Sequence, residues 1–144
     1  IVSVIKRAVD FYTMSSVNKI NFETKKKKII IKGDDEQLYR VFINLIKNSE
    51  DSISEKRDKN ATFIGKISVE IKENNSYITV ILTDNGTGIK DISKIMTPYF
   101  TTKKNGTGLG LPIVSKIINE HKGDIIITSK NFGAKATITF PKIK

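Results

Sequence analysis

The stretch that decides the fold opens with Asp84-Asn85-Gly86-Thr87-Gly88-Ile89 and closes with Gly106-Thr107-Gly108-Leu109-Gly110-Leu111. A polar segment joins the two glycine clusters and reads Tyr99-Phe100-Thr101-Thr102-Lys103-Lys104-Asn105. Glycine has no Cβ, so it lets backbone N–H groups approach a ligand closely and accepts positive φ. Two such clusters beside hydroxyls and cations predict a phosphate-binding cradle. Either cluster alone is as typical of a plain surface turn.

The residues after the second cluster predict a helix that begins at the glycines. Apolar side chains recur at spacings of three and four from Leu109 onward. Pro112 fits only in a first helical turn, where its missing N–H is harmless. The free N–H groups and partial positive charge of a helix N-terminus favour an anion, so a phosphate chain is the natural occupant. Neither cluster matches the dinucleotide fingerprint or the P-loop.

Composition is consistent with one domain, residues 1–144, since one domain commonly spans roughly 100 to 200 residues. The absence of cysteine excludes a disulfide framework and a thiolate metal site. No apolar run approaches the roughly 18 residues of a membrane span. The net charge of +10 raises the possibility of nucleic-acid binding, but the cations are scattered and nearly all are lysine. We therefore expect no nucleic-acid partner, and the start at Ile1 suggests a piece of a longer chain.

Hydrophobic periodicity predicts an α+β fold. We expect a helix over residues 1–12, a hairpin of strands 19–24 and 28–32, and a helix that begins after a capping box of Asp34 and Gln37. A charged loop is expected over residues 54–63, followed by strands 66–73, 77–84, 124–129 and 135–140. The total of about seven strands and three or four helices predicts a two-layer α/β sandwich, a mixed sheet with helices on one face.

Two positions on these elements suggest ligand chemistry. Asn44, Asn48 and Asp51 share one face of the second helix, where the amides are either solvated or oxygen ligands for a nucleotide or a magnesium ion. Asp84 ends a strand, where sheet ligands usually bind. A carboxylate at that place accepts a hydrogen bond from an exocyclic amine and so selects adenine over guanine.

Read together, these residues resemble the ATP-binding domain of bacterial sensor histidine kinases. That domain belongs to the GHKL superfamily, which also contains DNA gyrase, Hsp90 and MutL and has the Bergerat fold. Residues 44–49 are similar to the N box, 84–89 to the first glycine box, 98–103 to the F box and 106–111 to the second glycine box. The wording of the F box, the short lid and the tail at His121 most resemble the nitrogen-regulation (NtrB/NtrY-like) subgroup.

The resemblance implies Mg-ATP as the ligand. Asp84 would bind the adenine amine, Asn48 the metal, and Asn44 the phosphate or metal region. The remaining nucleotide-binding positions implied are Asp51, Gly86, Gly88, Ile89, Tyr99, Phe100, Thr101, Thr102, Lys103, Gly106, Thr107, Gly108, Leu109, Gly110 and Leu111. Lys103 is the candidate contact to the γ-phosphate, because Asp51 stands where many histidine kinases have a basic residue.

The resemblance also implies partners that lie outside this chain. The phosphoacceptor histidine of such kinases belongs to a separate dimerisation domain, to which residues 1–12 would connect, and His121 looks structural. The expected setting is the cytoplasmic part of a membrane-anchored sensor kinase that is dimeric when full-length, with a response regulator receiver domain as partner and with the isolated domain monomeric. Two alternatives stay open: an ATP-hydrolysing domain of the gyrase type, and a degenerate domain kept for docking. Asn44 replaces the glutamate base of gyrase-type relatives, which favours phosphoryl transfer.

Overall fold

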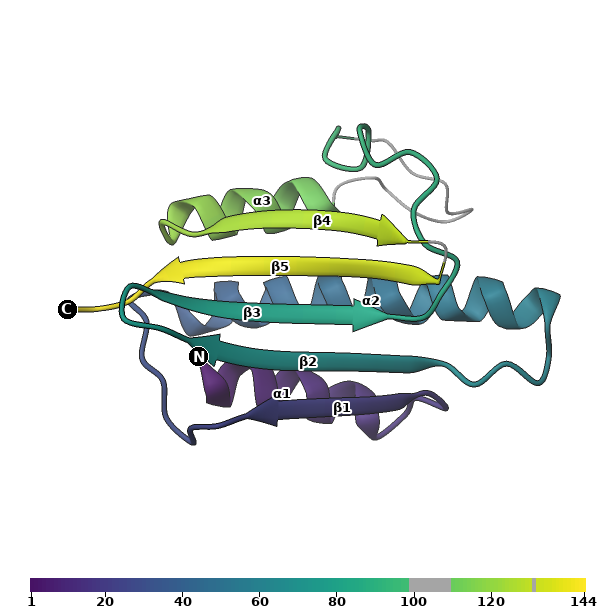
Figure 1. Ribbon diagram of the computed structural model, residues 1–144, viewed down its shortest axis with the longest axis horizontal. Helices are drawn as coiled ribbons and strands as arrows, with labels where there is room; N and C mark the ends of the chain where they lie inside the picture. Colours follow the sequence, from purple (N-terminus) through teal and green to yellow (C-terminus); the bar gives the residue numbers. More distant parts are fainter. Residues whose placement is uncertain (99–109, 131) are drawn as a thin grey trace.

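The computed structural model describes residues 1–98, 110–130 and 132–144. In this part of the chain the elements are α1 (Val2–Thr13), β1 (Lys19–Thr24), α2 (Asp35–Lys59), β2 (Lys66–Glu73), β3 (Tyr77–Asp84), α3 (Gly110–Glu120), β4 (Asp124–Lys130) and β5 (Gly133–Pro141). The three helices form one layer on one face of a five-stranded sheet (Figure 1). The predicted two-layer α/β sandwich with a mixed sheet is therefore confirmed.

The sheet has the strand order β1-β2-β3-β5-β4. β1 and β2 are parallel because the long helix α2 crosses between them, whereas the other neighbours pair antiparallel. β2 and β3 have the predicted bounds. Their turn is closed by Asn74, whose side-chain oxygen accepts from the N–H groups of Ser76 and Tyr77.

The predicted strand 28–32 is wrong, and so is the hairpin that it would form with β1. Residues 28–32 have no strand partner and instead lead from β1 toward α2. Ile29 is buried, and its carbonyl oxygen accepts from the N-terminal ammonium of Ile1. The isoleucine run therefore contributes to the core as a connection between layers. The described sheet accordingly has five strands instead of about seven.

The predicted loop 54–63 is wrong over its first half, since α2 continues to Lys59. Ile53 is the last buried residue of α2, so the apolar periodicity stops while the helix goes on. Basic residues in the last turn, Lys56, Arg57 and Lys59, complement the negative end of the helix dipole. At the other end, one half of the predicted capping box is present: Asp34 Oδ1 accepts from the N–H of Gln37 at 2.9 Å, whereas the N–H of Asp34 donates to His121 Nε2.

The core lies between the sheet and the helices. Alternate residues of the strands point inward, such as Ile67, Val69 and Ile71 of β2, whose opposite face carries polar residues. Helices α1 and α3 contribute their buried apolar side chains, so both helices are part of the core. None of the helices in the described ranges has the length and apolarity needed to span a bilayer.

Candidate functional site

Asp84 ends the central strand β3 and is held by hydrogen bonds from three elements. Its Oδ2 accepts from the hydroxyl of Ser49 on α2 at 2.8 Å. Its Oδ1 accepts from the N–H of Gly86 at 2.9 Å and from that of Ala134 on β5 at 3.4 Å. Asp84 is 7% exposed and Ser49 2%. Among the described residues, these donors leave one acceptor position on Oδ2, because each carboxylate oxygen has two lone pairs.

The loop after Asp84, residues 85–89, is fastened to α2. Ser52 Oγ accepts from the N–H of Thr87 at 2.9 Å, and Lys56 Nζ donates to the carbonyl oxygen of Asn85 at 3.0 Å. A Cβ at Gly86 would lie 2.2 Å from Ser52 Oγ, so only glycine fits at this approach. Gly88 has φ 76°, a conformation that favours glycine.

The end of β4 and the start of β5 also contact this segment. Ser129 Oγ accepts from the N–H of Ile89 at 2.7 Å. Gly133 has φ 131°, and a Cβ on it would lie 1.9 Å from the carbonyl oxygen of Asp84. The backbone of Gly133 therefore passes so close to Asp84 that no side chain is tolerated there.

Asn44, Asn48 and Asp51 lie half-buried on one face of α2, as their spacing predicts. Asn44 Nδ2 donates to the carbonyl oxygen of Arg40, one turn earlier, at 2.9 Å. Asp51 pairs with Lys47 at 3.2 Å. Burial, together with the charges of Asp51 and Glu50, raises the pKa of Tyr12 on α1.

The first residue of α3 lies against this face. A Cβ built on Gly110 would lie 3.5 Å from Asn44 Oδ1, an ordinary contact distance. The fold thus brings Gly110, near the end of the predicted second glycine box, next to Asn44 of the predicted N box, and Leu111 follows as a half-buried helical residue. Pro112 is in the first turn of α3, as predicted. The candidate positions Tyr99, Phe100, Thr101, Thr102, Lys103, Gly106, Thr107, Gly108 and Leu109 lie outside the described residues.

Within the described ranges, no group of three or more histidine, aspartate or glutamate side chains is placed to hold a metal ion. The amides on α2 suit magnesium only if the ligand supplies phosphate oxygens, because Mg²⁺ in nucleotide sites uses one or two protein oxygens plus phosphates and waters. The amide of Asn48, with Asn44 one turn before it, fits that requirement.

Sequence reasoning missed five residues that shape the site: Ser49, Ser52, Lys56, Ser129 and Gly133. Ser49 lies in the buried stripe of α2. A serine at a core position of a helix signals a hydrogen-bond partner elsewhere, because buried hydroxyls are rarely unpaired. The other four residues could be identified only from the folded structure.

His121 joins the end of α3 to the start of α2. Its Nδ1 lies 2.7 Å from the carbonyl oxygen of Ile117, and its Nε2 accepts from the N–H of Asp34 at 2.9 Å. These two contacts place the ring proton on Nδ1. The end of α3 and the start of α2 lie at the end of the molecule opposite the C-terminal end of β3 (Figure 1).

The sequence profile of the family described as histidine kinase-, DNA gyrase B-, and HSP90-like ATPases matches residues 33–144. The chain belongs to this family. The chain is similar to sporulation kinase A of Bacillus subtilis, with 38% identity over 135 residues, which cover 90% of this chain and 21% of that protein. Sensor histidine kinase ZraS of Salmonella typhimurium is 40% identical over 84% of this chain and 24% of its own length.

A putative sensor histidine kinase described as NtrY-like, from Rickettsia conorii, is 38% identical over 76% of this chain and 18% of that protein. The chain therefore spans about a fifth of the curated relatives that it matches. Among solved structures, the catalytic domain of histidine kinase ThkA has a TM-score of 0.82 at 27% identity, over 97% of this chain and 92% of that one. The GHKL fold and an ATP-binding domain of the histidine kinase type are thus established, whereas the relatives represent several kinds of sensor kinase.

Proposed function

We propose that this chain binds Mg-ATP and presents the γ-phosphate to a histidine on a separate dimerisation domain, as the catalytic part of a two-component sensor histidine kinase. The observation that carries the proposal is the Asp84 carboxylate. It is buried, it is oriented by three donors, and within the described part of the chain one acceptor position on Oδ2 remains. A group fixed in this way matches the exocyclic amine of adenine and opposes a carbonyl in the same place.

The remaining parts of the site receive roles from their positions. Gly86, Gly88 and Ile89 would form the wall beside the base, and Gly110 and Leu111 would offer the N-terminus of α3 to the phosphates. Asn48, with Asn44, would hold the magnesium ion, which when bound neutralises charge on the phosphate oxygens. The lid over the phosphates would include Tyr99 to Thr102 and Lys103, with Lys103 as the candidate contact to the γ-phosphate. The second glycine box would include Gly106 to Leu109.

The proposed reaction breaks the bond between the γ-phosphorus and its bridging oxygen and forms a phosphorus–nitrogen bond to the acceptor imidazole, with ADP as the leaving group. This chain would supply position and charge, and no side chain of it needs to become covalently modified. The amide of Asn44 cannot accept a proton from water, which supports transfer over hydrolysis.

The wider setting is also a proposal. We propose a dimeric, membrane-anchored kinase with its catalytic part in the cytoplasm, a response regulator receiver domain as the next phosphate acceptor, and the nitrogen-regulation type as subgroup. The acidic Asp51, paired with Lys47, supports that subgroup. The isolated chain would be monomeric, with residues 1–12 leading to the dimerisation domain.

The test is calorimetric titration with ATP, ADP and GTP, with and without magnesium, on the wild-type chain and on Asp84→Asn. We expect adenine-selective binding that magnesium strengthens. The variant amide can keep its oxygen toward the N–H of Gly86 and turn its nitrogen toward Ser49. A donor then faces the amine of adenine, so ATP affinity should fall roughly 10- to 100-fold while GTP loses less or gains.

The matched control is Asp10→Asn, which removes one exposed carboxylate on α1. It should leave the titrations unchanged. Equal ATP affinity in Asp84→Asn and the wild type would disprove the adenine role of Asp84. Steady ATP turnover that Asn44→Ala abolishes would favour the hydrolase alternative, and failure of every adenine nucleotide to bind would favour the docking alternative.

A further inference from the structure

One end of the molecule, remote from Asp84, collects much of the positive charge. Segments 23–32, 70–77 and 141–144 meet there: Thr24 is in register with Ile71, and Tyr77 with Pro141. These 22 residues contain eight lysines and three glutamates, a surplus of five positive charges in a chain of net charge +10. We name this end the lysine surface; its cations are Lys25 to Lys28, Lys32, Lys72, Lys142 and Lys144.

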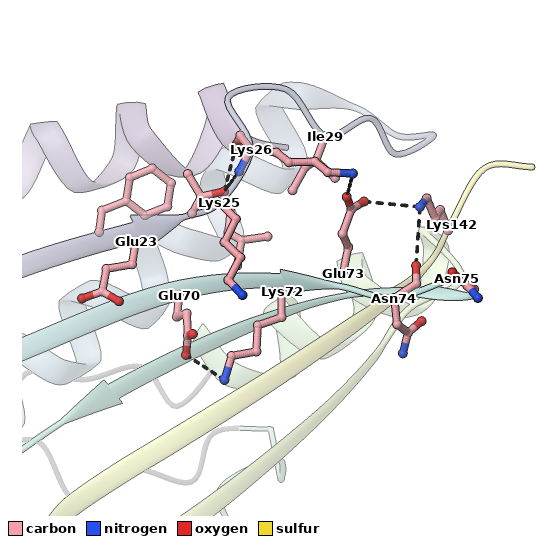
Figure 2. Close-up of a pocket in the computed structure, with 13 residues that line it drawn as sticks. Glu23, Lys25, Lys26, Ile29, Glu70, Lys72, Glu73, Asn74, Asn75 and Lys142 are labelled. Carbon is pink, nitrogen blue, oxygen red and sulfur yellow. Dashed lines mark hydrogen bonds and ion pairs between the residues drawn. The ribbon is translucent and has the colours of Figure 1, made fainter.

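A groove of about 1100 Å³ crosses the lysine surface. Its apolar lining comes from Phe22, Ile29 and Ile71, and its charged lining includes lysines from three separate segments. Figure 2 shows Lys26 and Lys142 approaching Glu73 from different sides. Both ammonium groups pair with that carboxylate, Lys142 at 3.5 Å.

Glu73 therefore fixes the lysine surface in place. Its side chain is only 16% exposed, and a hydrogen bond from Lys26, aided by Lys142, holds its pKa below the ordinary value. Because Glu73 stays ionised, it fastens the loop after β1 to the end of β2. Lys25, Lys27 and Lys28 are exposed on that fastened loop.

The other glutamates of these segments have partners of their own, and Glu23 accepts from Asn21 Nδ2 at 2.7 Å. Glu70 pairs with Lys72 at 3.1 Å. At the start of α2, Asp34 caps the helix and Glu36 pairs with Arg7. The exposed lysines of the loop after β1 thus keep a cationic field in front of the surface.

Large apolar side chains are exposed among these lysines. Ile30 is 59% exposed, Tyr77 50% and Ile143 51%. Lys142 N–H donates to the carbonyl oxygen of Ser76, which places Ile143 close to the start of β3. Lysines around exposed isoleucines and a tyrosine are the combination that binds the interface of an anionic bilayer, where ammonium groups meet lipid phosphates and apolar side chains enter the head-group region.

We propose that the lysine surface docks on an anionic phospholipid membrane. Nucleic acid fits less well, because this surface has no arginine for bidentate phosphate contacts and only one exposed aromatic residue for base stacking. An acidic protein surface would use the lysines but would leave Ile30 and Ile143 without a role.

The experiment is flotation of the 144-residue chain with vesicles of phosphatidylcholine alone and with one-third phosphatidylglycerol, at low and at physiological salt. We expect binding to the anionic vesicles only, weakened by salt. A lysine near an anionic surface strengthens partitioning roughly fivefold, so the triple variant K25Q/K27Q/K28Q should bind roughly 10- to 100-fold more weakly. This variant keeps the pairs of Lys26 and Lys142 with Glu73.

Two comparisons complete the test. K6Q/K59Q/K116Q removes the same charge from exposed helical lysines elsewhere and should reduce binding less than threefold. I30S/I143S keeps all charges and should weaken vesicle binding severalfold. The proposal is overturned if anionic vesicles do not bind, if the two lysine triples lose binding equally, if I30S/I143S binds like the wild type, or if polyglutamate or duplex DNA binds more tightly than the vesicles at equal anionic charge.

Discussion

The hydrogen bond between Ser49 and Asp84 should be worth several degrees of melting temperature. It is 2.8 Å long, its acceptor is charged, and both residues are buried. Hydrogen bonds to charged groups contribute about 1.5–3 kcal/mol, and burial keeps water from replacing the lost donor. We expect Ser49→Ala to lower the free energy of unfolding by about 2 kcal/mol and the melting temperature by roughly 4–8 °C.

The assay is urea unfolding followed by circular dichroism, in a double-mutant cycle that combines Ser49→Ala with Asp84→Asn. Contacting residues couple by about 0.5–3 kcal/mol, and we expect about 1–2 kcal/mol for this pair. Ser54→Ala is the matched control, since Ser54 is an exposed serine on the same helix. It should leave stability unchanged or raise it slightly, because alanine is the better helix former.

Two results would refute this reasoning. Equal stability of Ser49→Ala and Ser54→Ala would mean that the buried hydroxyl contributes nothing. Strictly additive losses for Ser49→Ala and Asp84→Asn would mean that the two side chains do not interact in solution.

Three further outcomes follow from the contacts. Gly133→Ala should lower the free energy of unfolding by more than about 2 kcal/mol and weaken ATP binding, because its Cβ would lie 1.9 Å from the carbonyl oxygen of Asp84. Gly110→Ala is the control: its Cβ would lie 3.5 Å from the nearest atom, so this variant should have the melting temperature of the wild type. His121→Leu should lower the free energy of unfolding in urea by about 1 kcal/mol, because the backbone N–H of Asp34 at the start of α2 loses its acceptor. A variant as stable as the wild type would contradict this role of His121. Hydrogen bonding from a lysine lowers the pKa of Glu73 in the folded state. The ionised carboxylate therefore stabilises the fold fully above the pKa of the unfolded chain, about 4.3, and this stabilisation is lost as pH falls through the pKa of the folded state. Glu73→Gln should therefore melt below the wild type at neutral pH, with the gap closing in acid; a pH-independent gap would contradict the ion pairs.

The sequence predicted the elements whose side-chain patterns are local. β2 and β3 alternate cleanly and have the predicted bounds, and the Asp34 cap marks the start of α2. The run Ile29–Ile31 looked like a strand because its composition is that of one. Whether it pairs depends on a partner elsewhere in the fold, and the crossover through α2 gives β1 its partner in β2 instead.

The sequence predicted the candidate ligand-binding residues, but it did not predict the side chains that hold them in place. Asp84, Asn44 and Gly110 were named from the glycine clusters and from helical spacing, and the fold places Gly110 against Asn44. Ser52 and Lys56 contact a loop about 30 residues away in sequence. No spacing rule links positions that far apart, so contacts of this kind emerge only from the packed structure.

The three donors to Asp84 come from α2, from the loop after β3 and from β5. The proposed adenine position consequently exists only after segments spread over most of the chain have assembled, so nucleotide binding would depend on the assembly of α2, β3 and β5. By mass action, a ligand that recognises only this assembled state stabilises it by about 2.7 kcal/mol at a concentration one hundred times its Kd. Nucleotide would then act as a folding aid for the whole domain, including variants damaged far from Asp84.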